Sequence, residues 1–253
     1  MILGRHGVFS QSMLQSTFAY AEQMNINATQ IFVKPPQQWT GREFTQHELN
    51  KWYNAKTDIY VCAHTGYFIN IAAGQHKSLF ALLHEARRCS KLGIKHLVVH
   101  PGSSLGKSLD EGIATAISSL EALVSRWPQD VTLLLETMAG QGNILSSLQT
   151  LKEVIAGMPD IPMGVCYDTA HAHGFGVDLL TTDEIYDPLI QLFHINDSEK
   201  ALASKKDRHA SLGTGTIPLS AFKRIAQIKN VPFIMETPLG NEVYDLEVFR
   251  SLA

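Results

Sequence analysis

Apolar, strand-like runs alternate with segments of helical spacing along the whole chain, about eight times in succession. A helical segment between two strands allows them to pair in parallel, so this alternation is typical of βαβ units. With 253 residues, the chain has the usual length of one (β/α)8 barrel, and its 45% of apolar residues can fill a large core. We therefore expect an α/β fold, a single-domain TIM barrel that spans residues 1–253.

The expected strands are the apolar runs bounded by turn residues. They lie at 1–4, with His6 at the end, then at 28–33, 59–63, 96–100, 131–135, from Met163 to near Asp168, at 191–195 and at 231–235. Helices are expected at about 12–24, at 76–92 and from about 242 onward. A polar loop from 196 to about 216 is too long for a simple turn between a strand and a helix, and loops of that length are usually functional or disordered.

Several of these runs end in His, Asp or Glu, and the active site of a barrel lies at the carboxyl ends of its strands. The barrel would therefore gather seven such side chains around one mouth, and the long loop after the seventh strand would add two more. The strand-end residues are His64, His100, Glu136, Asp168, His171, His194 and Glu236, and the loop residues are Asp207 and His209.

This group of five imidazoles and four carboxylates predicts a metal centre. One zinc ion takes about four ligands, so nine ligands suit a cluster of two or three ions. Imidazole mixed with carboxylate favours zinc, manganese or iron over calcium or magnesium. A cluster of this kind is a common solution to phosphoester hydrolysis, because it generates hydroxide at neutral pH and holds the phosphoryl oxygens.

The other six histidines are interpreted mostly as core or hydrogen-bonding residues, and three of them, His47, His76 and His84, are expected to face solvent from helices. The six are His6, His47, His76, His84, His96 and His173.

The remaining composition indicates the compartment and the partners. The three cysteines include no C-x-x-C pair and lie in apolar stretches, as buried thiols of a reducing, cytoplasmic compartment do. The start of the chain lacks a secretory pattern, and no run of about 18 apolar residues predicts a membrane span. A net charge of −3 argues against a broad nucleic-acid-binding surface but allows a local one.

Nine groups of short segments along the chain form a specific pattern through their order and spacing, although several are weak individually. They are Gly4–His6, Lys34–Trp39, His64–Tyr67, His100–Ser103, Glu136–Gly142, Gly164–Ala172, His194–Ser198, Asp207–His209 with Leu212–Gly215, and Met235–Pro238. Through these segments, over nearly its full length, the chain resembles the endonuclease IV family of apurinic/apyrimidinic endonucleases.

The resemblance implies a TIM barrel with zinc, three ions per chain, and with manganese or iron as alternatives at individual positions. It implies hydrolysis of the phosphodiester 5′ to abasic sites in double-stranded DNA, as part of base excision repair, leaving a 3′-hydroxyl and a 5′-deoxyribose phosphate. The enzyme would act as a monomer. The implied ligands are His64, His100 and the bridging, catalytic Glu136 for the first ion, then Glu136, Asp168, His194 and Glu236 for the second, and His171, Asp207 and His209 for the third.

The resemblance also implies DNA contacts, at Tyr67 and Phe68 in one inserting loop, at Gln37 and Trp39 in another, and at Arg208 for phosphate. For Trp39, packing at the base of its loop is an equal alternative. The chain departs from the family in three places. Gln37 stands in a loop where an arginine is usual, Glu136-Thr-Met-Ala-Gly replaces Glu-Asn-Thr-Ala-Gly, and Asp168-Thr-Ala-His replaces Asp-Thr-Cys-His.

Two rival functions remain open. A sugar isomerase or epimerase with a single metal ion, of the xylose-isomerase-like barrels, would need only Glu136, Asp168, His194 and Glu236. It has no use for the five other predicted ligands, which are His64, His100, His171, Asp207 and His209. A binder of damaged DNA that has lost turnover is the second rival, because the usual loop arginine is absent.

Overall fold

Eight parallel strands close into a barrel in the order β1-β10-β7-β6-β5-β4-β3-β2. The computed structural model describes residues 1–7, 13–103, 105–142 and 145–253. The barrel strands are β1 (Ile2–His6), β2 (Ala28–Phe32), β3 (Tyr60–His64), β4 (His96–Val99), β5 (Thr132–Glu136), β6 (Met163–Asp168), β7 (Ile190–Ile195) and β10 (Pro232–Met235). The predicted fold is confirmed, and each expected strand is found within about two residues of its predicted position.

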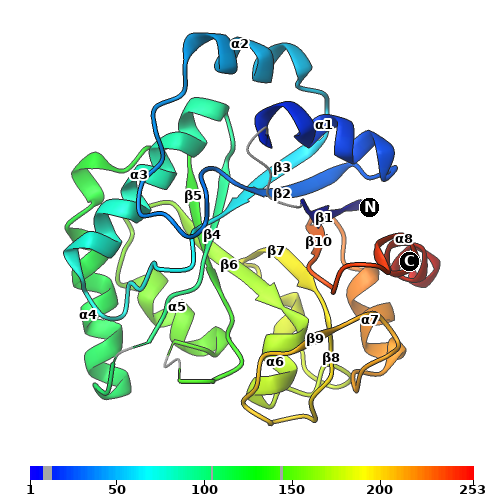
Figure 1. Ribbon diagram of the computed structural model, residues 1–253. Coiled ribbons are helices and arrows are strands. Elements are labelled where there is room, and N and C mark those ends of the chain that lie inside the picture. Colours follow the sequence, from blue (N-terminus) through cyan, green and yellow to red (C-terminus); the bar gives the residue numbers. More distant parts are fainter. Residues whose placement is uncertain (8–12, 104, 143–144) are drawn as a thin grey trace.

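Helices surround the barrel on the outside (Figure 1). They are α1 (Met13–Gln23), α2 (Gln46–Ala55), α3 (His76–Leu92), α4 (Leu109–Glu121), α5 (Leu148–Ala156), α6 (Thr169–Phe175), α7 (Leu219–Ala226) and α8 (Glu242–Leu252), with 3-10 turns at Val124–Arg126 and Glu184–Tyr186. The predicted bounds of α3 are confirmed, and this helix ends at Gly93 in the left-handed conformation. Within the described residues, no helix has the length and apolar character needed to cross a membrane.

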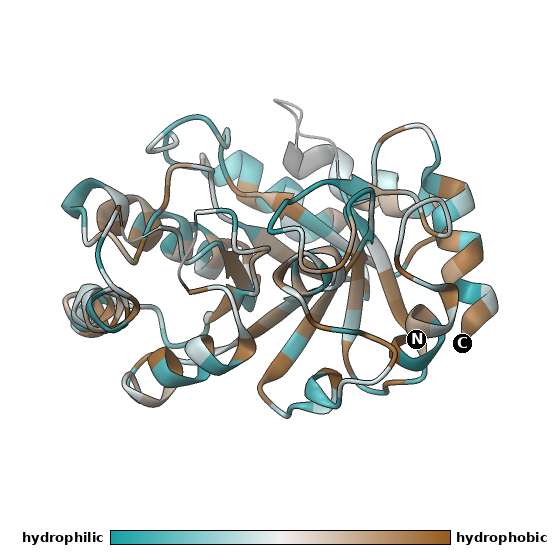
Figure 2. Cartoon of the chain, turned by 90° about the horizontal axis from the view of Figure 1, so that it is seen from below, coloured by the Kyte–Doolittle hydropathy of each residue, from teal (hydrophilic) through white to brown (hydrophobic). Residues whose placement is uncertain are grey.

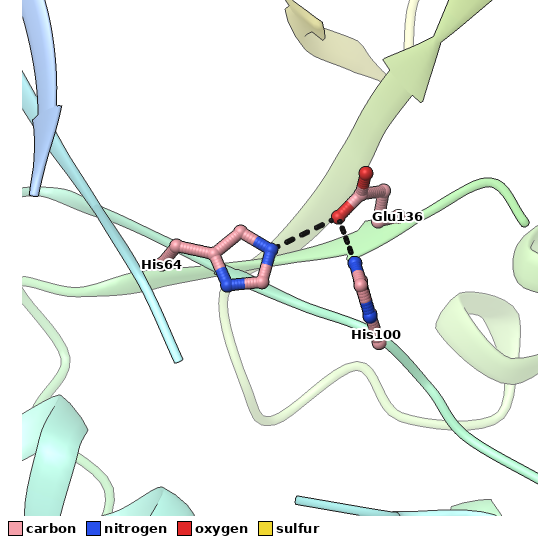
Figure 3. Close-up of side chains that lie close together, drawn as sticks. All are labelled: His64, His100 and Glu136. Atoms are coloured by element: carbon pink, nitrogen blue, oxygen red, sulfur yellow. Dashed lines mark hydrogen bonds and ion pairs between the residues drawn. The ribbon is translucent and has the colours of Figure 1, made fainter. Parts of the chain in front are cut away.

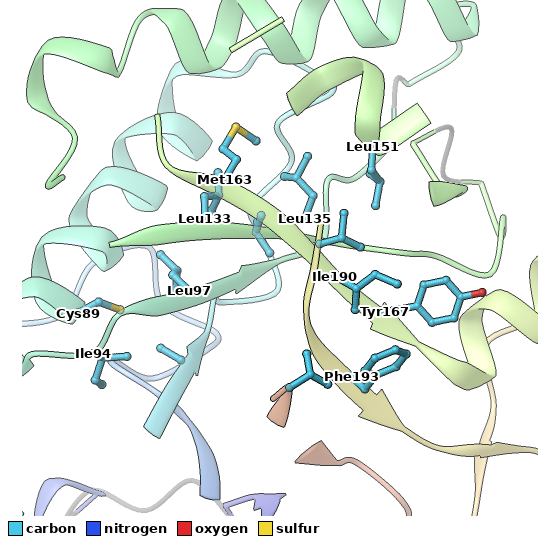
Figure 4. Packing of buried hydrophobic residues seen from close by; sticks show 14 of the residues in the cluster. Cys89, Ile94, Leu97, Leu133, Leu135, Leu151, Met163, Tyr167, Ile190 and Phe193 are labelled. Atoms are coloured by element: carbon cyan, nitrogen blue, oxygen red, sulfur yellow. The ribbon is translucent and has the colours of Figure 1, made fainter. Parts of the chain in front are cut away.

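The main hydrophobic core fills the space between the strands and the helices. Outward-facing strand residues such as Leu97, Leu133 and Phe193 pack there against the helices (Figure 4). The central strands are mostly apolar, whereas the outer helices also carry hydrophilic residues (Figure 2). This shell of apolar contacts fixes the strands, and the strands in turn fix the direction of the side chains that face the barrel interior.

A second, smaller apolar cluster fills the barrel interior, with one residue from each of seven strands. Its members are Ala28, Cys62, Val98, Leu134, Cys166, Leu192 and Ile234. Gly4 completes the ring on β1, because it pairs in register with both Ala28 and Ile234. A Cβ at Gly4 would lie 1.9 Å from the Ala28 carbonyl oxygen, so only glycine fits.

Successive residues of a strand point to opposite faces, so the residues two positions further along all point into the barrel as well. That residue is polar in all eight cases, and it lies within its strand or, for His100 and Glu236, directly after it. We call these eight the strand-end set: His6, Gln30, His64, His100, Glu136, Asp168, His194 and Glu236. The apolar cluster therefore forms a floor, and the strand-end set lies directly above it at the carboxyl ends of the strands.

The long loop between β7 and α7 is not irregular throughout. It contains a two-stranded antiparallel sheet, β8 (Asp197–Ser198) with β9 (His209–Ala210). The Asp197 carboxylate accepts hydrogen bonds from the backbone amides of Ser198, Gly213, Gly215 and Ile217 at 2.7–3.0 Å. The sequence patterns do not predict this sheet, because each of its strands has only two residues.

Candidate metal centre

Three sets of potential ligands meet at the mouth of the barrel. The first set is His64, His100 and Glu136, the second is Glu136, Asp168, His194 and Glu236, and the third is Asp168, His171 and His209. Within each set the ligand atoms lie within 4.8 Å of one another. Glu136 belongs to the first and second sets and Asp168 to the second and third, so two shared carboxylates join all three.

Glu136 is the fully buried centre of this arrangement. Its Oε2 lies 3.1 Å from His64 Nε2 and 3.0 Å from His100 Nε2 (Figure 3). Its other oxygen, Oε1, lies 3.0 Å from His194 Nδ1. The two oxygens therefore face different imidazoles, which is the geometry that a carboxylate bridging two cations requires.

Asp168 ends β6 and also caps the next helix, α6. Its Oδ1 accepts a hydrogen bond from the His171 backbone amide at 2.7 Å, and its Oδ2 accepts one from Asn196 Nδ2 at 2.7 Å. The Asp168 amide itself donates to Thr137 Oγ1 at 2.9 Å. This local fold explains the spacing of Asp168 and His171, because a capping residue and the third residue of its helix are held close together.

Backbone carbonyls orient three of the imidazoles. His64 Nδ1 lies 2.8 Å from the Thr65 carbonyl oxygen and His171 Nδ1 lies 2.9 Å from that of Thr137. His209 Nδ1 lies 3.2 Å from the Glu236 carbonyl oxygen. A proton on each Nδ1 satisfies these contacts and leaves the Nε2 lone pair directed at the cluster, as in many metal-binding histidines.

The two histidines of the third set, together with the neighbouring Asp207, have the chemistry of a cation site. His171 Nε2 and His209 Nε2 are both buried and have no hydrogen-bond partner in the described residues. Each lies 3.2 Å from a different oxygen of Asp207. A cation between these two imidazole nitrogens and the Asp207 carboxylate that they face would satisfy all three groups.

Sequence reasoning missed two residues of the strand-end set, His6 and Gln30. His6 Nδ1 lies 3.0 Å from Glu236 Oε1, although the sequence suggested only a core or hydrogen-bonding role for it. Gln30 Nε2 donates to Glu236 Oε1 at 2.6 Å, and Gln30 Oε1 lies 2.9 Å from His194 Nε2. Gln30 thus leaves His194 Nδ1 to face the carboxylates. Their common offset of two residues from the apolar floor could have identified both.

The buried charges stabilise one another. Burial alone would raise the pKa of Glu136, but the imidazoles of His100, His194 and His171 outweigh it and hold the pKa well below its usual range. Burial would lower the pKa of His194, but the carboxylates of Glu236 and Glu136 raise it to about 9. Without cations, the imidazoles therefore retain protons that bound metal ions would displace.

A cavity of about 420 Å³ opens above the cluster. Six of the predicted ligands line it: His64, His100, His171, Asp207, His209 and Glu236. Gln37 and Tyr67 form part of its wall, and Tyr67 is 62% exposed. Two of the residues expected to contact DNA therefore lie at the entrance to the candidate metal centre.

The other residues expected to contact DNA lie outside this cavity. The rings of Trp39 and Phe68 stack on each other with centroids 5.3 Å apart. Arg208 is exposed, and its guanidinium donates to the Asp207 carbonyl oxygen at 2.5 Å. The expectation that His84 faces solvent was wrong. The residue lies on α3, but its ring is half-buried and accepts a hydrogen bond from the Gly41 amide at 3.1 Å.

Comparisons with known proteins agree with this architecture. The model of the xylose isomerase-like TIM barrel family matches residues 18–251. A protein of Geobacter sulfurreducens named probable endonuclease 4 is 36% identical, over 92% of this chain and 88% of that protein. A protein of Protochlamydia amoebophila with the same name is 32% identical, over 98% of this chain and 96% of that protein.

Solved structures show the same relationship. Endonuclease IV from Thermus thermophilus has a TM-score of 0.83 and 27% identity, covering 100% of this chain and 98% of that one. A 3-keto-D-glucoside 4-epimerase from E. coli has a TM-score of 0.75 with 17% identity over 99% of both chains, which shows a common fold alone. The chain therefore belongs to the endonuclease IV family of nucleases, within the xylose isomerase-like TIM barrels.

Proposed function

We propose that this protein is a DNA repair endonuclease with three zinc ions that hydrolyses the phosphodiester 5′ to an abasic site in double-stranded DNA. The products would be a 3′-hydroxyl and a 5′-deoxyribose phosphate. One observation carries the proposal: the shared carboxylates of Glu136 and Asp168 join three ligand sets, and each of these sets has at least one member that lines the same cavity. The whole chain, residues 1–253, would act as one catalytic domain.

The bound ions would supply a hydroxide nucleophile at neutral pH and positive charge for the phosphoryl and leaving oxygens. The residues of the chain would hold these ions and fix their positions. Glu136 and Asp168 set the spacing between the ion sites, and the carbonyls of Thr65, Thr137 and Glu236 fix the imidazole rings. Because these groups are already ordered by the fold, little reorganisation is needed when the substrate arrives.

The size of the cavity also favours the proposal of an abasic substrate. Its volume of about 420 Å³ admits a sugar phosphate extruded from a duplex but not the duplex itself. Extrusion costs least where no base is stacked, and the exposed ring of Tyr67 can fill the gap that is left in the helix. Gln37 is the second candidate for insertion, and Arg208 is a candidate for phosphate contact.

The test is cleavage of a duplex that carries one abasic analogue, compared with the same duplex undamaged. We expect a single incision whose 3′ end a DNA polymerase can extend, and loss of the activity after chelation. Tyr67→Ala should raise KM for the abasic duplex about tenfold, the effect of one lost stacking contact. Incision of both duplexes at equal rates would refute the specificity for abasic sites.

A single-metal epimerase is the second candidate, because the second ligand set is complete without the others. The two functions differ in metal content. An epimerase needs one ion per chain, and substitution of His209 would leave its activity intact. In the proposed nuclease, His209→Ala removes a ligand of the third ion and should abolish cleavage.

A further inference from the structure

Two loops form the wall of the cavity on one side. The first rim loop, residues 33–42, follows β2 and carries Gln37, and the second rim loop, residues 65–70, follows β3 and carries Tyr67. A buried ion pair lies behind them, with Lys34 Nζ 2.9 Å from Glu85 Oε1. The side chains of this pair are 1% and 0% exposed.

Each member of the pair holds the backbone of a different position in the rim. Lys34 Nζ donates a hydrogen bond to the Gln38 carbonyl oxygen at 2.6 Å. Both oxygens of Glu85, on α3, accept from the Gly66 amide at 3.1 and 3.3 Å. One ion pair therefore connects the first rim loop to the second through a helix of the barrel.

The two loops also touch directly. The Tyr67 amide donates to the Pro36 carbonyl oxygen at 3.2 Å. A Cβ at Gly66 would lie 2.7 Å from Lys34 Nζ and 2.7 Å from the Pro36 carbonyl oxygen, so the approach leaves no room for a side chain. The relative position of Gln37 and Tyr67 thus depends on contacts around Lys34 and Gly66.

The same face of α3 holds both ends of the first rim loop. Arg88 lies one turn after Glu85, and its Nε donates to the Val33 carbonyl oxygen at 2.6 Å. Its Nη1 donates to the Arg42 carbonyl oxygen at 2.6 Å. With the ends fixed in this way, the Lys34–Glu85 pair governs the part of the loop that faces the cavity.

We propose that Lys34 and Glu85 are positioning residues that fix the two rim loops relative to each other. They thereby set the affinity of the cavity for its substrate. This inference rests on the proposed function. Neither residue lines the cavity or belongs to a ligand set, so neither takes part in the chemistry. The pair would confine the inserting side chains before DNA binds, which reduces the ordering cost of binding.

The variant Lys34→Met/Glu85→Leu tests the proposal, because it removes both tethers without leaving one buried charge unpaired. We expect KM for the abasic duplex to rise about tenfold, while kcat stays within about twofold and the metal content is unchanged. A KM equal to that of the wild type would overturn the proposal. So would a parallel loss of kcat and metal, because the pair would then support the metal centre itself.

A charge swap, Lys34→Glu/Glu85→Lys, tests whether the pair acts through its hydrogen bonds to the loops or only stabilises the fold as an ion pair. The swap restores an ion pair, but it places a carboxylate against the Gln38 carbonyl and an ammonium against the Gly66 amide. We therefore expect its KM to stay raised, and a return to the wild-type KM would contradict the proposal. The control is Lys152→Met/Asp187→Leu, which removes a 2.6 Å ion pair outside the rim loops and should leave KM unchanged.

Trp39 fluorescence reports on the rim without any activity. Trp39 is partly exposed and stacks on Phe68, whereas Trp52 and Trp127 are buried. The part of the acrylamide quenching that comes from Trp39 is identified as the part that disappears in Trp39→Phe. We expect this part to increase in Lys34→Met/Glu85→Leu, because Trp39 becomes more accessible when the loops are released. Unchanged quenching would refute the loop-positioning role. If the wild type fails to cleave abasic DNA, the proposed function fails, while this measurement still tests the loops.

Discussion

The strand-end set and the loop after β7 both contribute candidate ligands to the same centre, and different physical forces hold them in place. Glu136, Asp168 and His194 are fully buried on strands that parallel pairing and the apolar floor fix. Asp207 and His209 lie on a loop, and their side chains are 41% and 20% exposed. The barrel thus orders its candidate ligands through hydrophobic packing, whereas the loop depends on the polar contacts of Asp197.

The largest effects are expected when a candidate ligand itself is substituted, whether it belongs to two ligand sets or to one. Asp168 lies in two ligand sets and His171 in one, so Asp168→Ala should lose more metal per chain than His171→Ala. Both variants should lose cleavage activity by about a thousandfold or more, because transition-state charge is left unpaired. Elemental analysis of the purified variants checks the first claim, and equal metal loss would contradict the sharing of Asp168 between two ligand sets.

Metal removal should reverse the pH dependence of stability. In the metal-free protein, the pKa values of His194 on the barrel and His209 on the loop are both about 9, because nearby carboxylates outweigh burial. A raised pKa stabilises the fold fully below about pH 6.5, and this stability is lost as the pH rises toward 9. The expected loss is about 3 kcal/mol for each imidazole.

The metal-loaded protein should behave in the opposite way, because fewer protons compete for the imidazoles as the pH rises. Denaturant titrations from about pH 6 to about pH 9, with and without chelator, measure both profiles. Parallel profiles would show that these imidazoles do not exchange protons for metal.

Asp197→Asn should destabilise the loop after β7 without destabilising the barrel. An amide cannot accept all four backbone hydrogen bonds of Asp197, so about 2 kcal/mol of local stability should be lost. We expect faster hydrogen exchange in residues 197–217 and weaker binding of the third ion alone. Loss of all ions together would mean that the barrel sites depend on the loop.

Gln30→Ala should have the smallest effect, and it tests the strand-end set itself. Gln30 touches Glu236 and His194 without belonging to a ligand set, so its loss should weaken metal binding about tenfold. A competition titration with a chelator measures this change. Thr29→Ala, whose side chain hydrogen bonds the Arg5 carbonyl oxygen instead, is the matched control on the same strand.

The sequence predicts the barrel and the gathering of most candidate ligands at its mouth, because both depend on where the apolar runs begin and end. His64 and Glu136 each follow an apolar run, and α3 ends at a glycine as expected. Gln30 was missed because a single polar residue within a strand has no distinctive pattern. Its role appears only when all eight strands are aligned on their inward-facing residues.

Other features depend on contacts between distant parts of the chain. The ion pair of Lys34 with Glu85 joins residues of a loop and a helix, and no local pattern indicates it. The β8–β9 sheet is equally hidden, because Asp197 orders it through amides up to 20 residues away. Such polar networks are visible only once the hydrophobic core has placed the segments side by side.

The central claim is that three joined ligand sets act as one hydrolytic centre. The most direct test adds zinc stepwise to the metal-free protein and follows cleavage of a duplex with one abasic analogue. We predict negligible cleavage at one equivalent per chain and full cleavage at three. In Glu136→Gln, cleavage should stay absent at every zinc level. Full activity at one equivalent, or an active Glu136→Gln, would contradict the claim.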